Sequence, residues 1–380
     1  MKYMLIAGEA SGDLHASRLM ADIRAIDPQA TFTFLGGDRM AAVAGHAPLV
    51  HITDMAFMGF SEVLRNLGAI RRNMQTAVRA LDTERPDVLV PVDYPSFNLK
   101  VAAQARRRGI PVVYYISPKV WAWKEHRVRA LRRLVDSMLV IFPFEVDYYR
   151  DRHRMDVTFV GNPSVAEVDE ALAALPARSD FLQRHGLRDK PLIALLPGSR
   201  RGEIRNNLAV MTAAAERFPQ YRAVVAGAPG IDPSFYAALT DLPVVYGDTL
   251  GLLAHSRAAL VTSGTATLEA ALVGTPQVAC YRSNGSRLAY NLMRRLVKVP
   301  YVTLPNLIAD SPVIAELLLH NCTPDAIFDA LAPLLRDTPE RAAMLAGYAE
   351  VRRRLTASAA SAASAVATTA RTRDRTRART

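Results

Sequence analysis

Short apolar runs alternate along the chain with segments whose apolar residues have helical spacing. In the first half the apolar runs predict strands at Tyr3–Ala7, Phe32–Leu35, Val88–Val92, Val112–Ile116, Ser137–Ile141 and Thr158–Val160. Helices are predicted between them, as at Leu14–Ile23, Glu62–Leu81 and Leu99–Arg108. Strands that alternate with helices are typical of a parallel, doubly wound α/β sheet.

The second half repeats this plan after a polar helical stretch at Ala166–Gly186. Strands are predicted at Leu192–Leu196, Tyr221–Ala226, Val244–Tyr246, Ala259–Thr262 and Gln277–Tyr281, with a helix from about Glu203. We therefore expect an α/β fold of two doubly wound domains, 1–165 and 166–355, and a tail, 356–380. Two such sheets facing across a crevice bind ligands at the carboxyl ends of their strands.

Two turns of the second half have the composition of phosphate-binding turns. Gly198, Ser199 and Arg200 follow an apolar strand and open a helix, whose first N–H groups and dipole favour an anion. The same pattern recurs at Ser263, Gly264, Thr265, Ala266 and Thr267. Glu269, one turn later, is a candidate acceptor for a ribose diol. Together the turns indicate a nucleoside diphosphate, although an ordinary βα turn with a surface arginine explains the first alone equally well.

Carboxylates mark the corresponding turns of the first half. Asp93 directly follows a predicted strand and is the candidate general base, although aspartate in a turn is commonly only a local hydrogen-bond acceptor. In the loop Gly8–Asp13, the side chains of Glu9 and Asp13 would repel a phosphate, so the loop suits sugar hydroxyls. The alternative is that Asp13 caps a helix.

An apolar segment with flanking arginines indicates contact with lipid. Its large flexible side chains are Met55, Phe57, Met58, Phe60, Val63 and Leu64. Arg65, Arg71 and Arg72 follow, and such an element can lie in a headgroup layer or hold acyl chains. Ordinary core packing is the alternative.

Composition narrows the class of protein and its partners. The net charge of +11 favours nucleic acid, anionic lipid or phosphorylated substrates. No aromatic residue interrupts the arginines of Arg371–Thr380, so we expect no nucleic-acid partner and interpret this tail as a frayed, solubilising or lipid-touching extension. The sequence shows no membrane-spanning run and no signal peptide, so a cytoplasmic location is expected.

A metal or other cofactor is not expected. Cys280 and Cys322 are the only cysteines, the histidines are scattered, and no Asp-X-Asp pair stands where it could hold a divalent ion. A leaving diphosphate would then be stabilised by helix N-termini and by nearby cations, for which the candidates are Arg200, Arg205, Arg282 and Lys298.

Taken in order, seven stretches resemble the lipid-A-disaccharide synthase family. They cover nearly the whole chain to about Leu355 and are Gly8–Asp13, Met58–Val63, Asp93–Asn98, Ser117–Trp123, Leu196–Arg200, Ser263–Glu269 and Pro300–Ile308. The first and last are the most specific. Three positions depart from the family pattern: Asn162 where histidine is expected, Leu319 where glutamine is expected, and a missing glycine near Ala359–Ser361.

The resemblance implies a GT-B fold of two Rossmann-like domains and an inverting, metal-free transfer of 2,3-diacylglucosamine from UDP to the 6-hydroxyl of lipid X. The products are a β-1,6 disaccharide 1-phosphate and UDP. It implies Asp93 as the base, Gly8, Glu9, Ser11, Asp13 and Asn98 around the acceptor sugar, and the two glycine turns with Glu269, Tyr281 and Asn306 around UDP.

By the same resemblance, the Met55–Leu64 segment contacts acyl chains or the anionic inner face of the inner membrane, where the protein is peripheral. A homodimer is plausible because the last helical segments could pack against a partner. Two rival interpretations remain: another GT-B enzyme of UDP-N-acetylglucosamine, either a transferase or a 2-epimerase, and a non-catalytic basic nucleotide-binding protein.

Overall fold

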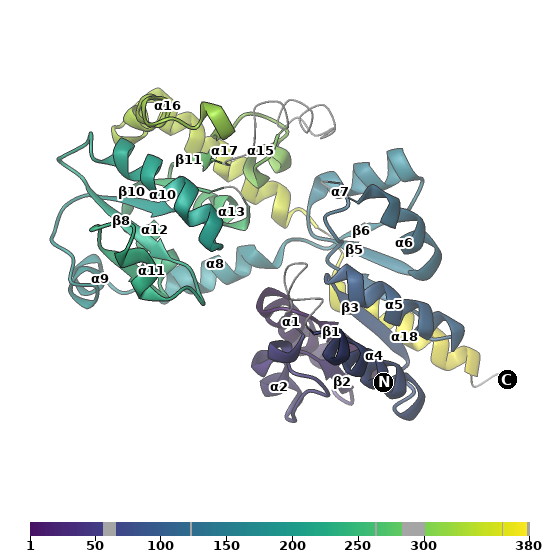
Figure 1. Ribbon diagram of the computed structural model, residues 1–380. Helices are drawn as coiled ribbons and strands as arrows, with labels where there is room; N and C mark the ends of the chain where they lie inside the picture. The colour runs from purple at the N-terminus through teal and green to yellow at the C-terminus, as the bar shows by residue number, and fades with distance from the viewer. Residues whose placement is uncertain (56–65, 122–123, 263, 283–300, 359, 378–380) are drawn as a thin grey trace. The chain divides into compact units, whose positions relative to one another are not determined.

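The protein folds as two α/β units in a computed structural model. The structure describes residues 1–380 except 56–65, 122–123, 263, 283–300, 359 and 378–380. Unit 1 comprises Met1–Asn162 and Ala357–Thr380, and unit 2 comprises Pro163–Thr356. Within the described ranges each unit has one six-stranded sheet, all of whose neighbouring strands pair in parallel (Figure 1).

Unit 1 has the strand order β2-β1-β3-β4-β5-β6. Its strands are β1 (Lys2–Ala7), β2 (Thr31–Leu35), β3 (Val88–Val92), β4 (Val113–Tyr115), β5 (Ser137–Val140) and β6 (Thr158–Phe159). Its helices are α1 (Ala10–Ile26), α2 (Asp38–Ala44), α4 (Leu67–Thr83), α5 (Pro95–Arg107), α6 (Val128–Leu134), α7 (Pro143–Asp147) and α18 (Ala362–Arg377). Short helical turns lie at η1 (Ile52–Asp54), η2 (Glu125–Arg127) and η3 (Tyr148–Arg152).

Unit 2 has the strand order β12-β11-β10-β7-β8-β9. Its strands are β7 (Leu192–Leu196), β8 (Arg222–Gly227), β9 (Val244–Tyr246), β10 (Ser256–Val261), β11 (Gln277–Tyr281) and β12 (Ala315–Leu318). Its helices are α8 (Pro163–Ala173), α9 (Arg178–Arg184), α10 (Arg201–Ala215), α11 (Pro233–Ala237), α12 (Thr249–Ala254), α13 (Thr265–Val273), α15 (Leu304–Ala309), α16 (Pro324–Leu331) and α17 (Pro339–Thr356), with short turns at η4 (Leu319–Asn321) and η5 (Ala332–Leu335).

The strands predicted from apolar runs are confirmed. Every residue of β3 and of β7 is buried, as expected for central strands of a parallel sheet that helices cover on both faces. The edge strand β12 was not predicted, because Ala315–Leu318 carries Glu316 and no β-branched residue. The α/β class and its doubly wound topology are therefore as the sequence predicted.

The order of the strands reverses once in each sheet. In unit 1 the chain runs outward from β1 to β2 and then crosses to β3 on the other side of β1. In unit 2 it runs from β7 to β9 and then crosses to β10 on the other side of β7. Loops diverge at such a reversal and leave a crevice at the carboxyl ends of the two central strands, where ligands of this fold class bind.

Helix α1 begins earlier than the sequence suggested. The stretch expected to be a loop from Gly8 to Asp13 is a turn only at Gly8 and Glu9, because α1 already begins at Ala10. Helix α5 likewise begins at Pro95, where the fixed backbone of proline suits the first helical position.

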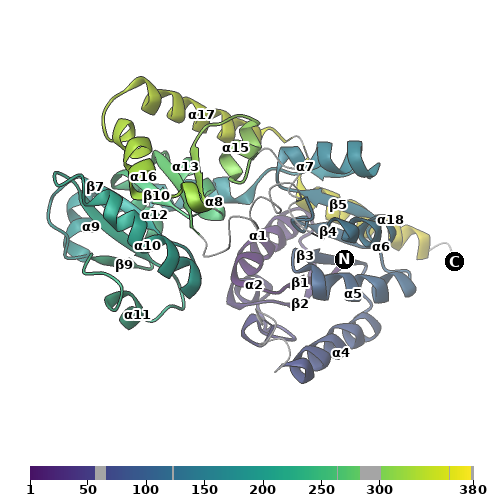
Figure 2. The same cartoon turned by 45° about the horizontal axis from the view of Figure 1, so that its top comes forward.

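The alanine- and serine-rich stretch that precedes the arginines of the tail is part of a packed helix. It forms α18, which packs on α1 and on strands β3 and β4 of unit 1 (Figures 1 and 2). Small apolar side chains at helical spacing make this face, and four of them are at most 2% exposed: Ala363, Val366, Ala367 and Ala370. One face of this last helix is thus buried within unit 1.

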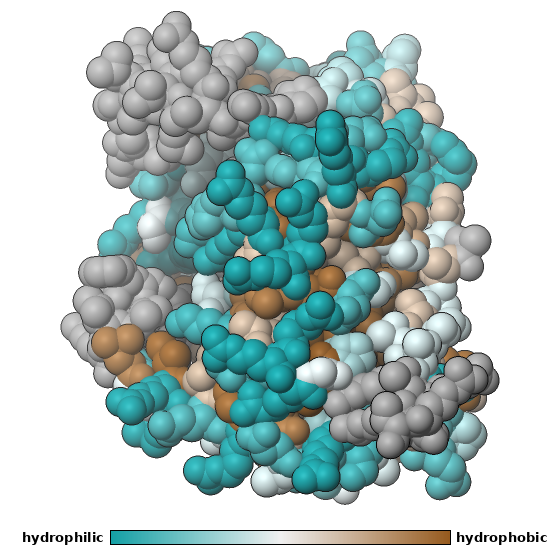
Figure 3. All heavy atoms as spheres, turned by 90° about the vertical axis from the view of Figure 1, so that its right-hand side faces the viewer, coloured by the Kyte–Doolittle hydropathy of each residue, from teal (hydrophilic) through white to brown (hydrophobic). Residues whose placement is uncertain are grey.

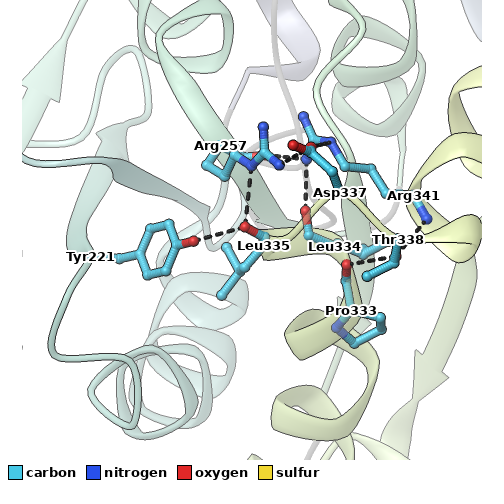
Figure 4. Close-up of polar contacts among 8 residues, drawn as sticks. All are labelled: Tyr221, Arg257, Pro333, Leu334, Leu335, Asp337, Thr338 and Arg341. Atoms are coloured by element: carbon cyan, nitrogen blue, oxygen red, sulfur yellow. Dashed lines mark hydrogen bonds and ion pairs between the residues drawn. The ribbon is translucent and has the colours of Figure 1, made fainter.

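The amino ends of β8 and β10 are closed by a polar cluster around η5 (Figure 4). Tyr221 and Arg257 both donate to the carbonyl oxygen of Leu335, at 2.7 and 3.2 Å. Arg341 donates to the carbonyl oxygens of Leu334 and Arg257, at 2.6 and 2.8 Å. These bonds satisfy carbonyl groups at the end of η5 and fix it to α17. The cluster lies at the opposite edge of the sheet from the crevice of unit 2.

The positive charge is concentrated in unit 1. Unit 1 carries 27 lysines and arginines against 18 acidic residues, a net charge of +9, whereas unit 2 carries 20 against 18, a net of +2. Hydrophilic side chains dominate the face shown in Figure 3, with smaller hydrophobic areas between them. None of the helices in the described parts of the chain has the length and apolar character needed to cross a bilayer.

Candidate functional site

A strained turn at the end of β3 carries the candidate base. Asp93 and Tyr94 both adopt left-handed backbone conformations, with φ angles of 42° and 48°. Ile116, which follows the neighbouring strand β4, is also left-handed, with φ of 63°. Such conformations cost roughly 1–3 kcal/mol each in residues with a side chain and persist only where the surroundings hold them. They cluster here at the carboxyl edge of the sheet.

Four hydrogen bonds hold this turn. The Asp93 carbonyl oxygen accepts from the Tyr114 hydroxyl at 2.6 Å and from the Asn98 amide at 2.7 Å. The Asp93 N–H donates to the carbonyl oxygen of Tyr115 at 3.1 Å, and the Tyr94 hydroxyl donates to that of Met55 at 2.8 Å. Asn98 was expected to contact the acceptor sugar, but it is fully buried and positions the Asp93 turn instead.

The surroundings of Asp93 raise the pKa of its carboxyl group to about 6. Burial is the main cause and the negative charge of Glu9 the next, while Lys119 and His15 act in the opposite direction. These groups follow β1 and β4, the neighbours of β3 in the sheet. A carboxyl group with such a pKa is mostly ionised at neutral pH yet basic enough to accept a proton from a hydroxyl.

The other acidic residues of this edge have different roles. The Asp13 carboxylate is 3% exposed and accepts backbone N–H groups of Gly37, Arg39 and Met40, at 2.7 to 3.2 Å. It therefore caps α2 and is not available to a sugar, which corrects its expected role. Glu9 remains partly exposed and accepts from the Ser11 hydroxyl at 2.9 Å.

Gly8 makes room for the ring of Tyr94. A β-carbon on Gly8 would lie 2.3 Å from the nearest ring carbon of Tyr94, so only glycine fits against this ring. Gly8 therefore allows the β1 and β3 turns to pack closely.

In unit 2, a carboxylate already occupies the first glycine turn. The Ser199 N–H donates to Glu203 Oε2 at 3.1 Å, and Arg200 pairs with Glu203 Oε1 at 3.1 Å. Gly198, with φ of 126°, lies so close that a β-carbon there would be 2.6 Å from Cβ of Glu203. Arg205, proposed as a phosphate ligand, stacks over the ring of Phe235 at 5.2 Å.

Asn207 joins this turn to the end of β11 and was missed from the sequence. Its amide donates to the carbonyl oxygens of Pro197 and Glu203, at 3.3 and 2.9 Å. Its Oδ1 accepts from the Arg282 N–H at 2.7 Å. Asn207 is fully buried in the middle of α10, and a polar residue inside a helix gives no signal of such distant partners.

The second glycine turn is open. Gly264 has φ of 132° and precedes α13, and a β-carbon there would meet no atom within 4 Å. Thr265 is exposed and Ala266 partly so, whereas Thr267 is fully buried and its hydroxyl donates to the Gly264 carbonyl oxygen at 2.8 Å. Ser263 lies outside the described residues. Among the described residues, none approaches the Gly264 position that precedes the first N–H groups of α13, as an anion site requires.

Glu269 is partly buried in α13, and its pKa is raised by burial and by the negative charge of Glu167 in α8. Tyr281 ends β11 on the same edge of the sheet and is partly exposed. Both positions remain compatible with a nucleoside at this edge.

The side chain of Asn306 has a structural role. It is 1% exposed, and its side chain bonds to the backbone of Ile314 and to Glu316, at 2.9 to 3.0 Å. Glu316 Oε1 also accepts from the N–H and hydroxyl of Thr303, at 2.9 and 2.7 Å, and so caps α15. The expected contact of Asn306 with UDP is therefore replaced by a role in holding α15 to β12.

The apolar lipid-contact segment is described only at its start. Met55 is 1% exposed and belongs to the core of unit 1 with Met4, Ile6 and Leu35, so it is not a lipid contact. Phe57, Met58, Phe60, Val63 and Leu64 lie outside the described residues. As for metals, no group of three or more His, Cys, Asp or Glu side chains suited to an ion occurs in the described ranges.

A family model and individual relatives match nearly the whole chain. The model described as lipid-A-disaccharide synthetase matches residues 3–370. The lipid-A-disaccharide synthase of Koribacter versatilis is 38% identical over 364 residues, covering 93% of each chain. That of Myxococcus xanthus is 40% identical over 370 residues, covering 95% of this chain and 94% of its own.

Solved structures show the same fold at low identity. UDP-GlcNAc 2-epimerase from Neisseria meningitidis, bound to UDP-GlcNAc, has a TM-score of 0.64 at 14% identity, covering 93% of this chain and 97% of its own. The calicheamicin glycosyltransferase CalG4 has a TM-score of 0.54 at 18% identity, covering 99% and 97%. These likenesses confirm the GT-B fold and nothing beyond it.

The raised pKa of Asp93 makes the stability of unit 1 depend on pH. Because the folded state binds this proton more tightly than the unfolded state, stability is lost as pH rises from 3.8 to about 6, by up to about 3 kcal/mol. Asp93→Asn removes this component, so the variant should be more stable than wild type at pH 7 and lose the advantage near pH 4. Both tryptophans belong to unit 1. Urea unfolding followed by tryptophan fluorescence therefore measures the difference in stability between the two proteins. A difference between the two proteins that does not change with pH contradicts the assignment.

Proposed function

The chain belongs to the lipid-A-disaccharide synthetase family, and on this premise we propose that it transfers 2,3-diacylglucosamine from UDP to the 6-hydroxyl of lipid X. The single observation that carries the chemical part of the proposal is the Asp93 carboxylate, held with a pKa of about 6 at the reversal of the unit 1 sheet. Transfer to an alcohol requires a base of this kind.

In the proposed reaction, Asp93 accepts the proton of the acceptor hydroxyl as its oxygen attacks the anomeric carbon. The bond from that carbon to the diphosphate oxygen breaks, and UDP leaves with the electron pair. A single displacement of this kind inverts the anomeric carbon and needs no covalent intermediate. Glu9 and Ser11, on the neighbouring turn, are the proposed contacts for acceptor hydroxyls.

UDP is proposed to bind at the reversal of the unit 2 sheet. The N–H groups that open α10 and α13, together with Arg200, would stabilise the negative charge that develops on the leaving diphosphate. Glu269 and Tyr281 are the proposed nucleoside contacts. The division between the units follows the composition of their turns: those of unit 1 carry Glu9 and the candidate base Asp93, whereas those of unit 2 carry glycines and open two helices.

The rival functions fit the observations less well. The 2-epimerase of Neisseria meningitidis shares the fold at 14% identity, whereas the synthases of Koribacter versatilis and Myxococcus xanthus are 38% and 40% identical over nearly the whole chain. A non-catalytic nucleotide-binding protein would have no use for a strained turn that holds a basic, largely buried carboxylate in unit 1.

The reaction is tested with UDP-2,3-diacylglucosamine and lipid X in the presence of EDTA. We expect disaccharide and UDP from wild type. The rate of Asp93→Asn should be lower by a factor of about one hundred or more, because the base is lost while the shape of the side chain remains. The matched control is Asp82→Asn, which changes a surface aspartate paired with Arg108 and should leave the rate unchanged. Equal rates from wild type and Asp93→Asn remove Asp93 as the base, and no product from wild type removes the proposed reaction.

We further propose that the protein is peripheral at the cytoplasmic face of the inner membrane, with unit 1 towards the anionic surface. Unit 1 carries a net charge of +9. Six of its cations are exposed on α5 and α6, two helices in contact with one another: Lys100, Arg106, Arg107, Arg129, Arg132 and Arg133. Each basic residue near such a surface contributes about 1 kcal/mol to binding.

Sedimentation with vesicles containing phosphatidylglycerol tests this orientation. The double variant Arg107→Glu, Arg133→Glu should bind at least about tenfold more weakly than wild type, with little change on neutral phosphatidylcholine vesicles. The double variant Arg184→Glu, Arg188→Glu makes the same change of charge at exposed positions of unit 2 and should bind nearly as wild type. Equal losses in the two variants mean that only net charge matters, which contradicts a binding face on unit 1.

A further inference from the structure

Glu203 occupies the place where an anion would bind at the start of α10. It lies in the first turn of the helix, and its carboxylate turns back to the preceding turn. There one oxygen accepts the Ser199 N–H at 3.1 Å and the other pairs with Arg200 at 3.1 Å. A backbone N–H at a helix start and an arginine are the groups with which proteins bind phosphate.

The close fit at Gly198 shows that Glu203 is seated in the turn. A β-carbon on Gly198 would lie 2.8 Å from Glu203 Oε2 and 2.6 Å from its Cβ. The backbone of Gly198, with φ of 126°, therefore leaves space that the glutamate fills. With the carboxylate in place, the charge of Arg200 is compensated and a diphosphate would meet a neutral turn.

The ion pair between Glu203 and Arg200 is weak enough for a ligand to displace. The Arg200 side chain is 73% exposed and that of Glu203 is 22% exposed, so water screens their attraction and the ion pair contributes little to stability. At the second turn, no side chain of the described residues fills the space beside Gly264. A diphosphate that bridges the two turns can thus dock at Gly264 and compete with Glu203 for the first turn.

We propose that Glu203 is an internal competitor of the nucleotide: its carboxylate holds the Ser199–Arg200 turn when UDP is absent and must be displaced when the diphosphate binds. This inference rests on the proposed binding of UDP at unit 2. The competition weakens UDP binding and speeds its release, because the returning carboxylate replaces the contacts that the leaving diphosphate gives up. Glu203 is a positioning residue for the turn and does not touch the reacting atoms.

The test measures the Kd and dissociation rate of UDP by calorimetry and stopped flow at fixed pH and salt. Glu203→Gln keeps the size of the side chain and removes its charge, and it should tighten UDP binding about three- to tenfold, mainly through slower dissociation. Uridine, which lacks phosphate, should bind wild type and variant alike. Glu216→Gln, at the other end of α10, is the matched control and should change neither ligand.

Glu203→Ala is the second variant and should shift UDP binding in the same direction. Weaker or unchanged UDP binding in the two Glu203 variants, with Glu216→Gln as wild type, overturns the inference and makes Glu203 a structural cap. Tighter binding of uridine as well as UDP also overturns it, since the effect would then not involve phosphate. Failure of wild type to bind UDP at all is a separate result, which contradicts the proposed function itself.

Discussion

The strained turn at Asp93 and Tyr94 is the constraint on which the proposed chemistry depends. Two consecutive left-handed residues with side chains are unfavourable, and here the Asn98 amide and the Tyr114 hydroxyl hold the turn by its carbonyl oxygen. Buried polar groups thus stabilise the backbone conformation of Asp93. The result is a carboxyl group at the reversal of the sheet, buried enough, and near enough to Glu9, for its pKa to reach about 6.

The two units share one topology, but their candidate sites suit different ligands. Each sheet reverses its strand order once, and each candidate site lies at that reversal. In unit 1 the turns carry Glu9 and Asp93, which suit the hydroxyls of an acceptor sugar. In unit 2 they carry glycines, helix N-termini and Arg200, which suit a diphosphate. Buried asparagines hold the backbone near each edge: Asn98 in unit 1, and Asn207 in unit 2.

Much of the fold could be predicted from the sequence because apolar runs and helical spacing are local signals. Strands such as Val88–Val92 and Leu192–Leu196 were predicted to the residue, and Asp93, the candidate base, follows the first of them. The supporting side chains could not be predicted in this way. Asp13, Asn98 and Asn306 look like ligand contacts in sequence, yet each bonds to backbone groups of another element.

Glu203 and α18 show a second limit of sequence reasoning. Glutamate in the first turn of a helix is common, and only the geometry reveals that Glu203 fills the turn beside Gly198. The alanine- and serine-rich C-terminal segment has the composition of a frayed tail, but small side chains at helical spacing let α18 pack closely on α1. Contacts between residues far apart in sequence decided each of these cases.

The pH dependence of kcat/KM tests the central claim most directly, because this quantity reports the ionisation of the free enzyme. The account predicts that kcat/KM falls on the acid side with an apparent pKa of about 6 and that Glu9→Gln moves this pKa down, since a neighbouring negative charge is removed. A profile that is flat between about pH 5 and 8, or an acid limb that Glu9→Gln leaves in place, would contradict the account.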